Sequence, residues 1–464
     1  MTELTSQSAS NLADLIRRRD VSPLEVAEAL LSRIDRLNPS INAIVTVSPN
    51  LLDEARQAEA ALMHGEQLGP LHGIPITIKD TINTAGLSTT SGSLLRADHI
   101  PEEDAPAVAR LKAAGAIILA KTNTAEMAMD YTADNPVFGR TNNPHDKTRT
   151  PGGSSGGEAA AIASCLSPGG LGSDLAGSIR IPAHFCGIVG FKPETGRIPG
   201  DGQFPPSAGP YALGSALGPM ARDIEDVRLL FSVLANSTLS AAQLAWRRSD
   251  VRVAWYTDDG ITPVTAETQA AVKAAALALA DAGLIVEERR PPCVDRALDL
   301  WLSLFSRASV VLLREVYTGH EEKAGDFVRW RLATADDAAL PTVDDYVRAW
   351  LERDRLRVVL IEWMNSTPLL LAPVGATPAF EHDAHKVMVE GKSISTFRAF
   401  SYSQAFNVFD LPAVTVPAGR SSEGLPIGVQ IIGRPGAEES IFAAAQIIEE
   451  ALGGWQPPPL SDKL

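Results

Sequence analysis

The stretch Gly73-Ile74-Pro75-Ile76-Thr77-Ile78-Lys79-Asp80 decides the fold class. It is short, apolar and rich in β-branched residues, a pattern that predicts a buried β-strand with Lys79 at its end. Residues 105–114 have the pattern of a helix, and residues 116–120 (Ala-Ile-Ile-Leu-Ala) predict a second buried strand. A strand, a helix and a strand in this order predict an α/β fold with helices on the faces of a sheet.

The rest of the chain extends this pattern without an internal repeat or a linker. Residues 1–65 are predicted to be helical, with a capping box at Ser22-Pro23-Leu24-Glu25 and a helix end at Asn38-Pro39. Residues 296–365 hold four of the seven tryptophans, in an amphipathic helical pattern. Because α/β enzymes often exceed ~150 residues per domain, residues 1–464 are predicted to form one large domain. Further strands are expected at 251–255, 284–286, 369–373, 413–417 and 428–433.

Composition excludes several classes of partner. The net charge is −15, from 41 basic and 56 acidic residues, so nucleic acid and anionic membranes are disfavoured as partners. No apolar run reaches the ~18 residues that span a bilayer, and the N-terminus lacks the pattern of a signal peptide. Cys165, Cys186 and Cys293 have the spacing of neither a disulfide framework nor a zinc site. These features predict a cytoplasmic protein.

Glycine is concentrated in one segment: 16 of the 36 glycines lie between Pro151 and Met220. This segment therefore needs backbone shapes or close approaches that a Cβ would forbid. It contains Ser154, within residues 151–158 (PGGSSGGE), and Ser178, within residues 172–182 (GSDLAGSIRIP). A tight turn before a helix can direct its backbone N–H groups at one point, where they would stabilise an oxyanion.

Three interpretations of this segment compete on residue chemistry alone. A phosphate loop is disfavoured, because neither the P-loop motif nor the dinucleotide-binding glycine motif occurs. Residues 153–157 match the G-x-S-x-G sequence motif of a nucleophile elbow. That motif must directly follow a buried strand, whereas the preceding residues 142–149 have the pattern of a polar turn, so the elbow is disfavoured. The third is a serine nucleophile that uses Lys79 as its base, because burial disfavours the charged form of an amine.

Seven segments identify the chain as resembling the amidase signature family. Together, and in this order, they cover most of the sequence except residues 296–365. They are Gly73–Asp80, Gly152–Gly157, Gly172–Ala183, Phe185–Pro193, Leu217–Asp223, Asp410–Ala413 and Gly424–Gln430.

The resemblance implies a fold and a set of catalytic groups. The fold would be a single domain with a central twisted mixed β-sheet covered on both faces by α-helices, with residues 66–225 as the signature core. Ser178 would be the nucleophile, Ser154 a bridging serine with a cis peptide bond, and Lys79 the general base. The oxyanion would be held by the backbone N–H groups of Leu175, Ala176, Gly177 and Ser178.

Neighbouring residues receive supporting roles. Ser155, Asp174 and Arg180 are expected to hold the turns by hydrogen bonds. Residues 296–365 are expected to cover the substrate pocket. Met127, Met129 and Tyr131 are expected to line the acyl pocket, with an ordinary packed core as the alternative.

Two positions depart from the commonest family pattern. Ala176 replaces a glycine, so the turn must not need a positive φ there. His184 replaces a small residue and suggests a Ser–His alternative, although a packed helix residue is favoured; a nucleophilic role for Cys186 is disfavoured in the same way.

The sequence thus predicts a serine hydrolase that cleaves a linear amide, anilide or carbamate (urethane), and also esters, without metal or cofactor. Its partners would be the small-molecule substrate and, as an open alternative, a second copy in a homodimer. The alternative function is the glutaminase subunit of a tRNA-dependent amidotransferase; Glu158 favours the stand-alone branch, since that subunit usually has a small residue there. Intact Lys79, Ser154 and Ser178 argue against an inactive scaffold.

Overall fold

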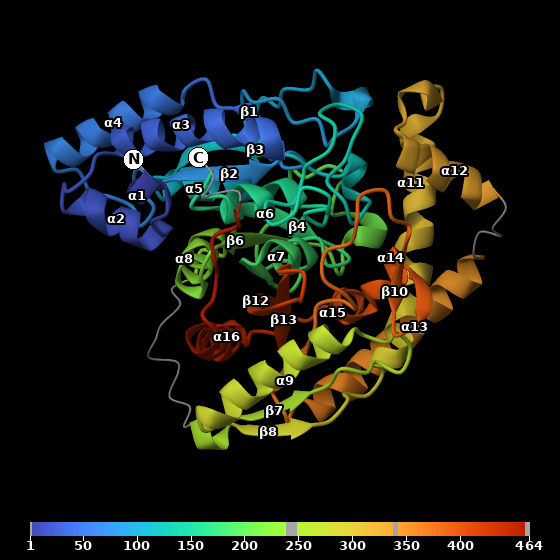
Figure 1. Cartoon of the computed structure of the whole chain (residues 1–464). Helices are drawn as coiled ribbons and strands as arrows, with labels where there is room; N and C mark the ends of the chain where they lie inside the picture. Colours follow the sequence, from blue (N-terminus) through green and yellow to red (C-terminus); the bar gives the residue numbers. More distant parts are fainter. Residues whose placement is uncertain (1, 238–247, 337–341, 460–464) are drawn as a thin grey trace.

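The protein contains an eleven-stranded sheet (Figure 1). From one edge of the sheet to the other, the neighbouring strands are β1-β3-β2-β4-β6-β5-β12-β13-β9-β7-β8. The computed structural model describes residues 2–237, 248–336 and 342–459. Beside the sheet stands a separate two-stranded hairpin. The strands of the main sheet are β1 Ile44–Val47, β2 Pro75–Lys79, β3 Ile117–Thr122, β4 Gly169–Asp174, β5 Val189–Lys192, β6 Ala216–Ala221, β7 Arg252–Trp255, β8 Ile285–Glu288, β9 Leu369–Pro373, β12 Ala413–Arg420 and β13 Pro426–Gly433. The hairpin strands are β10 Lys386–Val389 and β11 Lys392–Ser395.

The sheet is mixed, which confirms the predicted α/β fold. Strand β2 pairs in parallel with both β3 and β4, and β7 pairs in parallel with both β8 and β9. Each pairing along the series β4-β6-β5-β12-β13-β9 is antiparallel. Because β2 and β4 are parallel, their last residues, Lys79 and Asp174, lie at the same edge of the sheet.

Alternating side chains bury both faces of the sheet. In β9, Leu369 and Leu371 join the core packed under α8, α9 and α16, whereas Leu370 and Ala372 join the core packed under α7, α10 and α15. Side chains of a strand point alternately to opposite faces, so apolar residues at every position of β9 require cover on both sides. The covering helices are α6 Gly156–Ala163, α7 Arg180–Cys186, α8 Ile224–Leu234, α9 Ala266–Asp281, α10 Ala297–Trp301, α15 Ser401–Val408 and α16 Glu438–Leu452.

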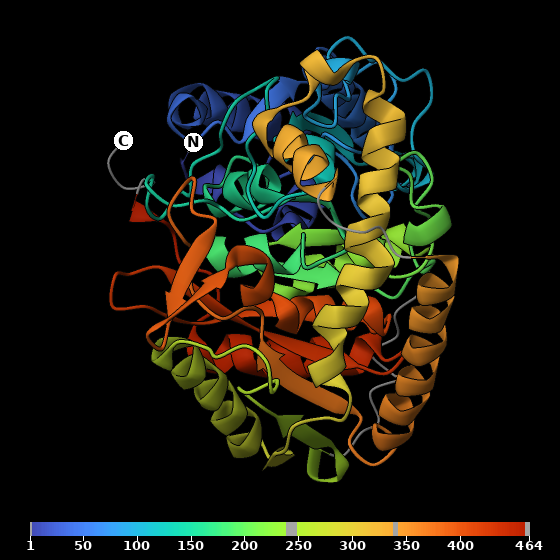
Figure 2. The same ribbon diagram turned by 90° about the vertical axis from the view of Figure 1, so that its right-hand side faces the viewer.

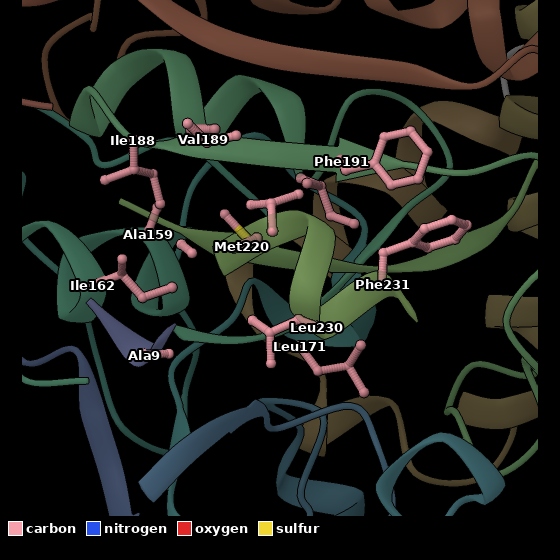
Figure 3. Close-up of a cluster of buried hydrophobic side chains, with 14 of the residues drawn as sticks. Ala9, Ala159, Ile162, Leu171, Ile188, Val189, Phe191, Met220, Leu230 and Phe231 are labelled. Atoms are coloured by element: carbon pink, nitrogen blue, oxygen red, sulfur yellow. The ribbon is translucent and has the colours of Figure 1, made fainter. Parts of the chain in front are cut away.

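One core fixes helix α6, which carries the glycine-rich turn at its start. Figure 3 shows Ala159 and Ile162 of α6 near Leu171 and Met220 of the sheet. Farther along, the rings of Phe191 and Phe231 meet edge to face, with centroids 5.0 Å apart. Every residue of α6 is buried, so its N-terminus has one position relative to the sheet.

The N-terminal 65 residues are not all helical, contrary to the expectation. Strand β1 joins the sheet antiparallel to β3, and its four residues (IVTV) are β-branched. The predicted capping box at Ser22 is confirmed, but its helix continues through Pro39 to Ile41. It ends there because Asn42 is left-handed and the Asn38 side chain accepts the N–H groups of residues 43 and 44. The helices of this part are α1 Thr2–Thr5, α2 Ala9–Arg17, α3 Pro23–Ile41 and α4 Leu51–His64.

Residues 296–365 are helical within the described ranges and stand along one side of the molecule (Figure 2). Helix α10 continues through a π-helical turn, Leu302–Ser306, into α11. Of the helices in the described ranges, none is long and apolar enough to cross a membrane. The helices of this region are α10, α11 Arg307–Tyr317, α12 Asp326–Asp336 and α13 Val343–Trp363; α5 Pro106–Ala113 and α14 Thr396–Ala399 complete the set.

Replacing Phe231 by alanine should destabilise the protein by about 3–5 kcal/mol, because a fully buried aromatic ring leaves a cavity between α8 and the sheet. The matched control is Leu277→Ala on α9: this side chain is 64% exposed, so its loss should cost less than about 0.5 kcal/mol. Urea unfolding of both variants measures the difference. Equal midpoints would contradict the packing described for this core.

Candidate active site

Lys79 is buried at the end of β2 and contacts two serine hydroxyls. Its Nζ donates to Ser154 Oγ at 2.6 Å and to Ser173 Oγ at 3.0 Å. Ser154 lies in the turn before α6, directly after a cis peptide bond between Gly153 and Ser154. The glycine at 153 is required by a close approach, since a Cβ there would lie 2.0 Å from the carbonyl oxygen of Thr132.

The surroundings of Lys79 favour a neutral amine. Burial lowers its pKa to about 7, although the carboxylates of Asp174 and Glu158 act in the opposite direction. A lysine with this pKa is substantially unprotonated near neutral pH, when it can accept a proton.

Glu158 is a buried acid that sequence analysis did not place in the site. It lies in the first turn of α6, where its carboxylate accepts hydrogen bonds from the hydroxyls of Thr77 and Thr122, the latter at 2.7 Å. Burial raises the pKa of Glu158 to about 7, against the opposing effect of those hydrogen bonds and of Lys79 and Lys121. A single acid in a helix otherwise made of glycine, alanine and isoleucine was the available signal.

The second serine, Ser178, lies in the turn between β4 and α7. The carboxylate of Asp174, at the end of β4, accepts the N–H groups of Gly177 at 2.8 Å and Ile179 at 3.2 Å. Gly177 has φ +105°, a conformation that residues with a Cβ rarely adopt, and Ala176 needs no such angle. The turn is therefore folded around one carboxylate.

Ser178 lines the pocket, together with Ser154 and Ser173. In the described part of the chain, no hydrogen bond engages the N–H groups of Leu175, Ala176 or Ser178. The N–H of Gly177 differs from the expected set of four, because it is already bonded to Asp174. The geometry therefore leaves three of the four predicted donors available to an incoming oxygen.

Arg180 neutralises Asp174 in the interior, where both side chains are fully buried. Burial alone would raise the pKa of Asp174, but the Arg180 guanidinium, 3.0 Å away, holds that pKa well below its usual range. The same guanidinium donates to Gln430 at 2.9 Å and to Asn407 at 2.6 Å. Gln430 ends one of the family-like segments, whereas no sequence signal pointed to Asn407.

A pocket of about 810 Å³, including its open mouth, leads to these serines. The candidate pocket residues Met127, Met129 and Tyr131 all line it, and the Tyr131 hydroxyl donates to the carbonyl of Ala176 at 3.1 Å. Residues 296–365 contribute Trp301, Phe305, Ser306, Ser309 and Arg331 to its wall.

The nucleophile elbow lacks its structural context. Among the described residues, no strand lies between β3 and the start of α6. The Ser155 hydroxyl is directed at the backbone of Ser173, donating to its carbonyl and accepting its N–H, both at 3.3 Å. Ser155 thus supports the turn and is not among the residues that line the pocket.

The histidine and cysteine alternatives are disfavoured by their contacts. His184 is fully buried; its Nδ1 accepts the N–H of Gly428 at 2.6 Å, and its Nε2 bonds the carbonyl of Thr377 at 3.1 Å. With both ring nitrogens engaged, it is a packed helix residue. Burial raises the pKa of the Cys186 thiol, whose Sγ lies 3.5 Å from the carbonyl of Pro151, so a reactive thiolate is disfavoured.

Comparison with known proteins identifies the family to which this sequence and fold are similar. The Amidase family profile matches residues 25–442. Human fatty-acid amide hydrolase 2 is 31% identical, over 97% of this chain and 90% of its own. A glutamyl-tRNA(Gln) amidotransferase subunit from Moorella thermoacetica is 33% identical, over 97% of both chains. The structure also resembles that of a bacterial aryl acylamidase of the amidase signature family, with a TM-score of 0.86, 26% identity and 99% of each chain covered.

Replacing Arg180 by methionine should destabilise the protein by about 3–5 kcal/mol, because it leaves the buried carboxylate of Asp174 without its counter-charge. The control is Arg56→Met, which breaks an exposed pair with Asp53 and should cost less than about 1 kcal/mol. Chemical denaturation followed by circular dichroism reports both values. If the two variants lost equal stability, the ion pair would not organise this turn.

Proposed function

This chain belongs to the amidase signature family of hydrolases acting on C–N bonds, and from that premise we propose that it cleaves a linear amide, anilide or carbamate through an acyl-enzyme on Ser178. Esters, which carry a better leaving group, would also be substrates. One observation carries the proposal: the buried Lys79 amine contacts Ser154, whose hydroxyl lines the same pocket as that of Ser178.

In this mechanism, neutral Lys79 accepts the proton of Ser154, and Ser154 accepts the proton of Ser178. The Ser178 oxygen then attacks the carbonyl carbon of the substrate. The N–H groups of Leu175, Ala176 and Ser178 stabilise the oxyanion, because they lie in the turn before α7 and have no other acceptor in the described part of the chain. The proton returns through Ser154 to the leaving nitrogen, the amine departs, and water hydrolyses the acyl-enzyme by the same route.

The pocket favours an apolar or aromatic group on at least one side of the scissile bond. Its wall includes Met127, Met129, Trp301, Phe305 and Phe397. Binding of an apolar ligand in a concave site lined by large apolar side chains is favourable, because it removes apolar surface from water.

The second candidate function is glutamine hydrolysis within a tRNA-dependent amidotransferase, favoured by the 33% identity to one protein of that kind. A purified chain that hydrolyses anilides by itself supports the first function. Glutamine hydrolysis that requires added partner proteins supports the second.

Ser178→Ala should abolish covalent labelling by a fluorophosphonate probe and lower amide turnover by more than about a thousandfold, because the attacking oxygen is lost. Mass spectrometry of the labelled peptide identifies the modified serine. The control is Ser249→Ala, at an exposed position far along the chain, which should label like the wild type. Label on Ser155 in place of Ser178 would reject the assignment.

The pH dependence of kcat/KM should follow Lys79. Because only the neutral amine accepts a proton, activity should rise as the pH rises through about 7, the pKa of Lys79, and should be lost below it. Glu158→Gln removes a negative charge that raises this pKa, so the acid limb should move to lower pH. Glu102→Gln, at an exposed position, is the control and should leave the limb in place. If Glu158→Gln left the low-pH side of the kcat/KM profile unchanged, the proposed electrostatic effect of Glu158 on the pKa of Lys79 would be contradicted.

A further inference from the structure

One end of the pocket is polar and carries an arginine without a counter-charge. Arg331, from α12, lines the pocket with Tyr211, Ser306 and Ser309. Within the described ranges, no aspartate or glutamate lies within ion-pair distance of Arg331. Burial lowers the pKa of its guanidinium, so the charge is held in a partly desolvated place.

One nitrogen of the Arg331 guanidinium is occupied by the protein. Its Nη2 donates to the carbonyl and to the hydroxyl of Ser306, the carbonyl contact measuring 2.7 Å. Its Nε and Nη1 have no acceptor among the described residues. Both paired edges of a guanidinium include Nη2, so with Nη2 bonded to Ser306 the N–H groups of Nε and Nη1 remain available as separate donors.

Tyr211 provides a second, independent donor at the same end. Its side chain is only 7% exposed, it lines the pocket, and its hydroxyl has no hydrogen-bond partner of good geometry in the described part of the chain. Burial raises the pKa of this phenol, against smaller opposing effects of a hydrogen-bonding contact with the Ser309 side chain and of the Arg331 charge, so the hydroxyl keeps its proton. The hydroxyl therefore has only Ser309 as a neighbouring acceptor, without good geometry, and a ligand oxygen would supply a better one.

The surrounding structure holds Arg331 in place. The π-helical turn Leu302–Ser306 ends at the carbonyl that Arg331 bonds, and Ser309 donates to the same carbonyl at 2.6 Å. Helix α12 is fixed just before its start, because Glu126 accepts the N–H of Gly325 at 3.0 Å and the hydroxyl of Tyr317 at 2.7 Å. The position of the guanidinium is therefore fixed by the π-helical turn, by α11 and by the contacts of Glu126 at the start of α12.

The acids that line the pocket have partners of their own. Asp174 is paired with Arg180, and Asp130 accepts the Thr132 hydroxyl and the N–H of Tyr131, both at 2.8 Å. Neither acid is among the groups that shift the pKa of Arg331. This end of the pocket is consequently positive.

We propose that Arg331 and Tyr211 form a binding site for a carboxylate that the substrate carries away from its scissile amide. The inference rests on the proposed amide hydrolysis. It narrows the substrate class to amides that combine an apolar or aromatic segment with a terminal carboxylate. The carboxylate would accept a charge-assisted hydrogen bond from the unoccupied N–H groups of the guanidinium and a second hydrogen bond from Tyr211.

The test compares three ligands that differ in one carboxylate: pentananilide, glutaric acid monoanilide, and N-(4-carboxyphenyl)pentanamide. The second places the charge on the acyl side, and the third places it on the amine side. Isothermal titration into the Ser178→Ala protein measures affinity without turnover. We expect at least one carboxylated ligand to bind roughly 10–100-fold more tightly than pentananilide.

Three variants in the Ser178→Ala background assign the effect. Arg331→Met keeps the apolar stem of the side chain. It should remove the preference for carboxylated ligands and leave the affinity for pentananilide within about twofold of that of the Ser178→Ala protein. Arg331→Lys, which keeps the charge without the fork, should retain only part of the preference. Arg329→Met, on the same helix but exposed, should change neither affinity.

Two results would overturn the proposal: equal affinity for charged and neutral ligands, or a preference that survives Arg331→Met. The fluorophosphonate experiment separates this outcome from failure of the proposed function. Loss of Ser178 labelling with an intact carboxylate preference rejects the hydrolase mechanism alone. Normal labelling without the preference rejects the carboxylate site alone.

Discussion

The buried ion pair between Asp174 and Arg180 is the interaction on which the site depends. Its carboxylate ends strand β4 and bonds two N–H groups of the following turn, while its guanidinium reaches Asn407 and Gln430 in distant segments. An unpaired charge at this depth would be strongly unfavourable, so the pair holds the turn, α7, α15 and β13 in one arrangement. The position of Ser178 follows from that arrangement.

A second balance of charge surrounds Lys79. The side chains of Lys79, Lys121 and Glu158 are all fully buried, and the hydroxyl groups of Thr77 and Thr122 bridge the carboxylate to the strands. Desolvation lowers the pKa of the lysines and raises that of the acid, which brings Lys79 and Glu158 to about the same value. The proposed proton relay would need an amine of this kind near neutral pH, and burial at the end of a central strand supplies one.

Local patterns predicted the elements, and packing decided their limits. The apolar run that ends at Lys79 was correctly predicted as a strand, because alternation and β-branching act over a few residues. The short strand β1 was missed among helices, and the helix predicted to stop at Pro39 continued for two residues. The proline disrupts only one turn, and contacts of Asn38 with the following chain compensate for it.

By itself, the sequence determined the α/β class and the buried strand that ends at Lys79, since both depend on local patterns. Its resemblance to a family pointed to Lys79, Ser154 and Ser178 and to the cis peptide bond before Ser154, which the structure contains. Only the tertiary structure decided which N–H groups of the turn remain available, that Glu158 lies beside Lys79, and that Arg331 enters the pocket. Those features depend on contacts between residues that lie far apart in the chain. In the network that holds the turn, for example, Arg180 and Asn407 are 227 positions apart. Their side chains meet only after both faces of the sheet are covered, and a pattern of residue types does not encode that encounter.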